Sequence, residues 1–257
     1  MFFSFPIRIK HLAMIVCMVS ITSAGILAIL SSPKNIVTAE PVAVLTAGLG
    51  VATIDGFVDP TEWAAAASYT SDMFNSNPQI TGTLYVMQDS SNLYFGFTLA
   101  DDEFTIHPEG LYEIYGDTLE FNFDDNNSGL LYEVGENKVS VFPITPFVRD
   151  AYFENISGSS YMDTSAVGGE NNGIGMVARH ADLTHFELSF PICSGDAYDF
   201  CLGPNILFGV NLGYIDMYPA PDGVDYDVYG FPEGSFENLV QIQLIEISPI
   251  YLPLIQR

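Results

Sequence analysis

Three short segments of the sequence concentrate oxygen-bearing side chains, which are the ligands that hard cations prefer. Residues 101–103 (Asp-Asp-Glu), 124–129 (Asp-Asp-Asn-Asn-Ser-Gly) and 222–227 (Asp-Gly-Val-Asp-Tyr-Asp) place carboxylates beside turn-forming residues. Calcium takes six to eight oxygens in a flexible arrangement, so we expect a calcium site where the first two segments meet at one rim. The alternative is solvated acidic turns. The expected ligands are Asp101, Asp102, Asp124, Asp125 and Asn127.

The second of these segments begins like an EF-hand loop. Gly135 stands where the closing glutamate of that motif belongs, so the sequence does not complete an EF-hand. Any calcium site here must therefore draw ligands from more than one segment.

Aromatic residues form a second group with chemical potential. They lie in turn-like, aspartate-rich segments instead of on alternating strands, and comprise Tyr112, Tyr115, Tyr226, Tyr229 and Phe231. Flat rings beside polar groups bind sugars well, because the rings stack on CH faces while neighbouring groups take hydrogen bonds. The alternative is that these rings pack the ends of the fold.

Motifs for catalysis are scarce. The sequence contains no G-x-S-x-G, no H-E-x-x-H and no glycine loop for phosphate. Of the later histidines, His180 and His185 are five residues apart, and odd spacing on one strand would point them to opposite faces. With 32 acidic residues, two carboxylates will lie close by chance. We therefore expect a binding domain and not an enzyme.

The elements that must position these residues have strand patterns. Residues 83–88 and 93–99 flank the polar turn 89–92 and predict a hairpin, and 118–123 alternates polar and apolar residues. Further strands are expected at 138–142, 174–179, 185–190, 207–215 and 240–247. The sequence predicts an all-β fold, an antiparallel β-sandwich.

One short helix is expected near the N-terminal end of the sandwich. Asp59 can cap it, Pro60 suits its first position and Glu62 can reach back to the cap. Trp63 and the alanines at 64–67 would follow, so we expect this helix to cover one end of the sandwich.

The first 39 residues have the order of a secretory signal peptide. Arg8 and Lys10 precede an uncharged apolar run at 12–30, and small residues end at Ala39, where we expect cleavage. An uncleaved membrane anchor is the alternative, because the run is long enough to span a bilayer. Residues 40–257 are expected to form one domain. They hold four basic and 32 acidic residues, a charge that disfavours nucleic acid and anionic membranes.

Cysteine use is consistent with export. Cys193 and Cys201 remain after the signal peptide, and the short loop between them can close as a disulfide in an oxidising compartment. Two reduced thiols are the alternative. Zinc is not supported, since no further cysteine or nearby histidine completes a ligand set.

In order along the chain, several segments resemble family 9 carbohydrate-binding modules and their DOMON-like relatives. Residues 54–63 (Ile-Asp-Gly-Phe-Val-Asp-Pro-Thr-Glu-Trp) resemble the family's opening, residues 84–102 its next hairpin and residues 116–124 its most recognisable strand. Residues 185–191, 209–216 and 238–239 resemble later strands, so the likeness covers 51–245. The resemblance implies a β-sandwich, bound calcium and, in sugar-binding members, a ligand held between two tryptophans.

The sequence departs from that pattern at the ligand site. Its only tryptophan is Trp63, in the opening motif, where a structural role is expected. Ile114 falls at the first clamp position and Tyr229 near the second, and Ser140, Phe142 and Gly213 stand where polar sugar contacts would be. The resemblance and the aromatic residues together give the expected ligand-binding set Tyr112, Tyr115, Asp117, Glu120 and Tyr229.

These observations predict a secreted or cell-surface, non-catalytic module that binds a polysaccharide or oligosaccharide and is stabilised by calcium. No nucleic-acid partner is expected. Membrane contact is expected only if the N-terminal segment stays uncleaved. Two alternatives stay open. Some relatives hold haem b through methionine with histidine or lysine, which Met87 and the histidines would permit. A calcium-stabilised structural or adhesion domain without a small ligand is the other.

Overall fold

The structure of the protein is a computed structural model. It describes residues 41–76, 79–101, 104–111, 114–130, 132–144, 148–154, 160–163, 168–220, 223–235 and 238–247. The expected signal peptide lies outside these residues. Within them, no helix is long and apolar enough to cross a membrane.

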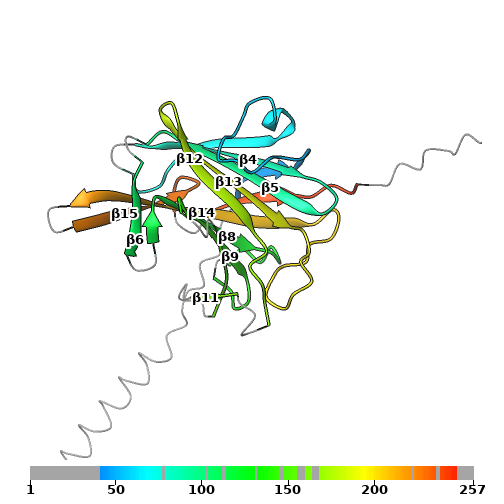
Figure 1. Ribbon diagram of the computed structural model, residues 1–257. Coiled ribbons are helices and arrows are strands. Elements are labelled where there is room, and N and C mark those ends of the chain that lie inside the picture. Colours follow the sequence, from blue (N-terminus) through cyan, green and yellow to red (C-terminus); the bar gives the residue numbers. More distant parts are fainter. Residues whose placement is uncertain are drawn as a thin grey trace, which may run out of the picture. The chain divides into compact units, whose positions relative to one another are not determined.

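The larger sheet has eight strands within the described residues. Its order is β1-β16-β14-β8-β9-β10-β11, and β15 pairs with β14. Figure 1 labels β8, β9, β11, β14 and β15 of this sheet. All its pairings are antiparallel except β1 with β16. The strands are β1 (Pro41–Thr46), β8 (Thr118–Asp124), β9 (Asn137–Val141), β10 (Val148–Phe153), β11 (Ser160–Met162), β14 (Leu207–Ala220), β15 (Gly223–Phe231) and β16 (Leu239–Gln243).

The smaller sheet has six strands among the residues that the structure describes. Its order is β12-β13-β5-β4-β2, and β3 pairs with β4. Only β2 with β4 is parallel. The strands are β2 (Gly48–Leu49), β3 (Ala67–Asp72), β4 (Thr81–Gln88), β5 (Asn92–Leu99), β12 (Ile174–His180) and β13 (Leu183–Pro191). A separate hairpin consists of β6 (Ile106–Leu111) and β7 (Ile114–Gly116).

The two sheets pack face to face through aromatic side chains. Phe95 of β5 and Phe121 of β8 are both fully buried, with ring centroids 5.4 Å apart. Alternation along β8 sends Phe121 and Phe123 inward and Glu120 to the opposite face. This confirms the predicted all-β sandwich, including the hairpin around residues 89–92 and every expected strand. The last strand is shorter than expected, because β16 ends at Gln243.

The expected short helix is a single 3₁₀ turn, Trp63–Ala65. The Asp59 carboxylate accepts hydrogen bonds from the backbone N–H groups of Thr61 and Glu62, as expected for a cap. Glu62 does not reach back to the cap, because its Oε1 accepts the N–H of Thr53 at 2.6 Å. Ala67 already belongs to β3.

Trp63 packs on the outer face of the smaller sheet, which corrects the expectation that its helix covers an end of the sandwich. It is 3 % exposed and lies in a small apolar cluster with Ala52, Val58, Met87 and Tyr94. Met87 and Tyr94 are the outward residues of β4 and β5, since their neighbours along each strand point into the main core. The opening motif is therefore a cover for this sheet.

A buried carboxylate on β13 holds that cover in place. Glu187 is fully buried, and its Oε2 accepts the backbone N–H groups of Asp55 and Gly56 at 2.9 and 2.8 Å. Its Oε1 accepts the indole N–H of Trp63 at 3.0 Å. Burial raises the pKa of Glu187, and the three donors oppose that rise. Trp63 therefore has a structural role, as expected, and Glu187 is its hydrogen-bond partner.

His180 and His185 lie on the paired strands β12 and β13, on either side of a tight turn. Their ring centroids are 5.3 Å apart, and both rings contact Phe57. The expectation that they point to opposite faces of one strand was wrong, because a turn at residues 181–182 separates them. The Nδ1 atom of His185 accepts the N–H of Val58, so this ring also supports the cover.

Candidate functional site

The outer face of the larger sheet carries a row of polar residues around Glu120. Backbone pairing places Gly213 of β14 on one side of Glu120 and Ser140 of β9 on the other. A Cβ atom on Gly213 would lie 3.8 Å from Glu120 Oε2, an ordinary van der Waals distance, and Gly213 itself is buried. The three positions come from separate strands, and only sheet register brings them together.

Two basic residues complete this surface. Lys138 Nζ lies 2.7 Å from Glu120 Oε1, and both side chains are partly exposed. Arg149 of β10 pairs with Ser140, and its guanidinium lies 5.2 Å from the ring centre of Phe142. After residue 39 the chain has only four basic residues, so two of them are gathered here. We call Gly213, Glu120, Ser140, Lys138 and Arg149 the Glu120 face.

The structure separates the expected sugar-binding residues. Glu120 is on the Glu120 face, whereas Asp117 is fully buried and Tyr229 is 7 % exposed within the main core. The ring of Tyr229 packs 6.2 Å from that of Tyr214, and burial with the charges of Asp216 and Asp227 raises its pKa to about 12. Tyr229 therefore offers no open ring face.

The remaining expected aromatic residues that the structure describes lie on two hairpins. Tyr115 is in β7, which lies against β14. Tyr112 lies outside the described residues. Tyr226 is exposed on β15, and Phe231 of the same strand is fully buried. Phe231, like Tyr229, therefore packs in the core of the sandwich, which is the alternative role given for these rings.

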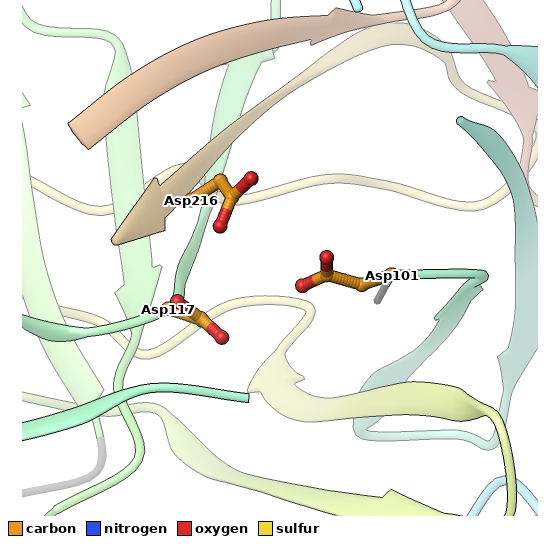
Figure 2. Close-up of side chains that lie close together, drawn as sticks. All are labelled: Asp101, Asp117 and Asp216. Carbon is orange, nitrogen blue, oxygen red and sulfur yellow. The ribbon is translucent and has the colours of Figure 1, made fainter. Parts of the chain in front are cut away.

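Asp117 belongs to a buried cluster of three aspartates (Figure 2). Asp101 follows β5, Asp117 precedes β8 and Asp216 is on β14; one oxygen of each lies within 4.8 Å of the others. Figure 2 shows the three carboxylates directed toward a common point from these elements. We call this set the aspartate cluster.

Protein donors already bind part of the aspartate cluster. Asp117 accepts the backbone N–H groups of Thr105 and Met217 at 2.8 and 3.0 Å, and Asp101 accepts the hydroxyl of Tyr214. Burial, together with the charges of Asp101 and Asp216, raises the pKa of Asp117 to about 8. Three buried carboxylates this close need a cation or a shared proton to offset their charge. Carboxylate oxygens are also the donors that calcium prefers, so the cluster fits that ion.

The expected calcium site cannot form as a single centre. Asp101 lies beside Asp117 at the start of β8, whereas Asp124 is the last residue of that strand. Seven residues of strand separate the two ends by roughly 23 Å at about 3.3 Å per residue. The expectation that Asp101 and Asp124 meet at one rim is therefore wrong. Asp102 lies outside the described residues.

The expected ligands at the far end of β8 have mainly structural partners. Asp124 is fully buried and accepts the N–H groups of Ser128 and Gly129, both at 2.8 Å. Asn127 accepts a hydrogen bond from Gln241. Asp125 instead lines a hollow of about 460 Å³ with Glu133 and Glu136. Burial, together with the charges of Asp124, Glu133 and Asp125, raises the pKa of Glu136 to about 8.

Other expectations can be placed directly. Cys193 and Cys201 form the predicted disulfide. Met87, which the haem alternative would use, is fully buried in the small cluster beside Trp63. Lys138 and Arg149 were missed from the sequence, because neither belongs to a motif. The signal that could have found them is the register of the strands next to β8.

This arrangement of sheets is that of a known class of β-sandwich. Neither a protein-family model nor a curated protein matches the sequence. Among solved structures, a family 9 carbohydrate-binding module from Caldicellulosiruptor kristjanssonii in complex with cellotriose is similar, with a TM-score of 0.56 and 13 % identity. The match covers 83 % of this chain and 100 % of that chain.

A second structure of such a module from the same organism, in complex with glucose, gives a TM-score of 0.55 and 13 % identity. It covers 80 % of this chain and 97 % of the other. The chain therefore has the fold of family 9 carbohydrate-binding modules, and the predicted likeness to that family is confirmed at the level of the fold.

Proposed function

We propose that this protein is a non-catalytic carbohydrate-binding module that acts outside the cytoplasm. The observation that carries the proposal is the Glu120 face on a sandwich whose similar structures are solved with cellotriose and glucose. A partly exposed carboxylate, ammonium group and guanidinium on adjacent strands provide donors and acceptors for sugar hydroxyls, and the buried Ser140 hydroxyl lies behind Glu120.

The disulfide supports the proposed location, because such bonds persist in oxidising compartments. Sequencing the N-terminus of the exported protein tests the signal peptide. We expect the chain to begin at Glu40, and an intact Met1 on a membrane fraction would show that the segment is an anchor.

The direct test of the proposal is titration of the purified protein against a panel of oligosaccharides that includes cellotriose, in millimolar calcium. Binding to at least one glycan is expected. No binding at millimolar concentrations of every glycan would overturn the proposal.

We propose calcium as a stabiliser, held at the aspartate cluster of Asp101, Asp117 and Asp216. A ligand that binds only the folded protein contributes about 2.7 kcal/mol at one hundred times its Kd. For a chain of this size, that is roughly 5 to 10 °C in Tm. The test is thermal unfolding in calcium, in magnesium and in chelator at equal ionic strength. Asp216→Asn should reduce the calcium shift, and equal Tm values for wild type in calcium and chelator would reject the site.

A second candidate is a calcium-stabilised structural or adhesion domain without a small ligand. The burial of Tyr229 and Asp117 favours it, because two residues expected to contact sugar belong to the interior. It predicts the calcium shift without glycan binding, so the two measurements together separate the candidates.

A further inference from the structure

A second acidic cluster lies between the disulfide loop and the edge of the larger sheet. Asp150 is on β10, Asp163 follows β11 and Asp199 is inside the loop that Cys193 and Cys201 close. One carboxylate oxygen of each lies within 4.8 Å of the others. We call Asp150, Asp163 and Asp199 the loop cluster; none of the three was expected from the sequence to bind a metal.

The loop cluster contains buried oxygens without partners. Asp150 is 1 % exposed and Asp163 is 3 % exposed. Asp150 Oδ1 and both carboxylate oxygens of Asp163 accept no hydrogen bond. Within the described part of the chain, no lysine or arginine forms an ion pair with either residue. Buried charges are otherwise paired or bound to metal, because removing them from water is costly.

The surrounding structure fixes the geometry of these carboxylates. The side-chain amides of Asn137 and Asn172 donate to the two oxygens of Asp199 at 2.9 and 3.0 Å. The backbone N–H of Asn172 donates to Asp150 Oδ2 at 3.3 Å and leaves Oδ1 available. A Cβ atom on Gly169 would lie 1.3 Å from Asp163 Oδ1, so any larger residue at position 169 would displace this carboxylate.

Electrostatics agree with this geometry. Burial, together with the charge of Asp199, raises the pKa of Asp150 to about 8. Burial, with the charges of Asp196 and Asp199, raises the pKa of Asp163 to about 6. Asp196 is close by and accepts the N–H groups of Tyr198 and Asp199, so a fourth negative charge faces the same region. A divalent cation would offset this charge.

We propose that the loop cluster binds Ca²⁺, independently of the aspartate cluster and of the Glu120 face. Both oxygens of Asp163 and Oδ1 of Asp150 are ligands, Asp199 adds a third carboxylate and water completes the shell. Several carboxylates with an incomplete protein shell suit calcium, which takes six to eight oxygens, better than magnesium, which requires a tight octahedron. The ion ties the disulfide loop to the exposed edge of the larger sheet.

Calorimetric titration of the purified protein with calcium tests this proposal, using the variants Asp163→Asn and Asp182→Asn. Asp182 is in the exposed turn between β12 and β13 and serves as the matched control. The Asp163→Asn variant should bind one Ca²⁺ fewer per chain than wild type and lose roughly 5 to 10 °C of the calcium-dependent Tm shift. In chelator it should be at least as stable as wild type, because one repelling charge is gone. The control should match wild type.

Equal calcium stoichiometry in Asp163→Asn and wild type would overturn the proposal. If that variant fails to fold, terbium provides a second measurement, since it substitutes for calcium and emits when a nearby tyrosine is excited. Tyr198 is next to Asp199 and stacks on Tyr152 at 4.3 Å. Tyr198→Phe should reduce terbium emission, and unchanged emission would contradict the site. Failure of glycan binding alone would leave these calcium results unaffected.

Discussion

The buried bond between Glu187 and Trp63 gives a quantitative test of how the N-terminal motif is held. In Glu187→Gln the amide keeps one oxygen for the N–H groups of Asp55 and Gly56, but turns its NH₂ group toward the indole N–H. Two donors then face each other in a fully buried setting. A buried hydrogen bond to a charged group contributes about 1.5–3 kcal/mol, so we expect a loss of about 2 kcal/mol in the free energy of unfolding. Glu187→Ala removes all three bonds and, at about 1.5 kcal/mol for each, should cost about 4.5 kcal/mol.

The assay is urea unfolding followed by circular dichroism and by tryptophan fluorescence. Because the sequence has a single tryptophan, fluorescence reports on this motif alone. Adding Trp63→Phe to Glu187→Gln removes the opposing donor. The double variant should therefore lose about 1 kcal/mol less in the free energy of unfolding than the two single variants lose together. Glu62→Gln is the control, since its single exposed bond to Thr53 should cost less than about 1 kcal/mol. A cost below about 0.5 kcal/mol for Glu187→Gln, or strict additivity, would refute the reasoning.

Three further predictions address other parts of the fold. Burial and the nearby His180 lower the pKa of His185 to about 4, so the unfolded chain takes up a proton below pH 6.5 that the folded chain does not. Wild type should therefore lose about 3 kcal/mol relative to His185→Gln as pH falls from 7 to 4, and parallel stability profiles would contradict this. Replacing Cys193 and Cys201 with serine should cost about 2.5 kcal/mol in urea unfolding for a loop this short, and a stability equal to that of wild type would count against that value. Asn211→Ala, which removes hydrogen bonds to two backbone carbonyls, should cost about 2 kcal/mol, and a neutral effect would show that these bonds are replaced by water.

Local patterns were sufficient to predict the sandwich. Alternation along 118–123 and the polar turn at 89–92 depend only on neighbouring residues, and both became the expected strands and hairpin. The disulfide was also predictable, because its two cysteines are close in sequence. The helix was overestimated, because Ala67 is drawn into β3 by pairing with Val86, a contact that sequence propensity does not contain.

The candidate sites were harder to predict, because they depend on register and on which end of a strand a residue occupies. Asp101 and Asp124 looked equivalent in sequence, but β8 separates them. The residues around Glu120 come from the consecutive strands β8, β9 and β10 and from the distant β14, and no motif connects them. The loop cluster unites residues from 150 to 199 that share no motif. Strand pairing was the missing information in each case.

The measurement that tests the central claim most directly compares glycan affinity in wild type, Glu120→Ala and Asp182→Asn. Calorimetry is carried out in calcium with the tightest-binding glycan of the panel. The Glu120 face predicts at least a tenfold weaker binding for Glu120→Ala, about 1.4 kcal/mol, with folding unchanged by circular dichroism. Asp182→Asn, on the other sheet, should bind as wild type does. Equal affinity in Glu120→Ala and wild type would contradict the account.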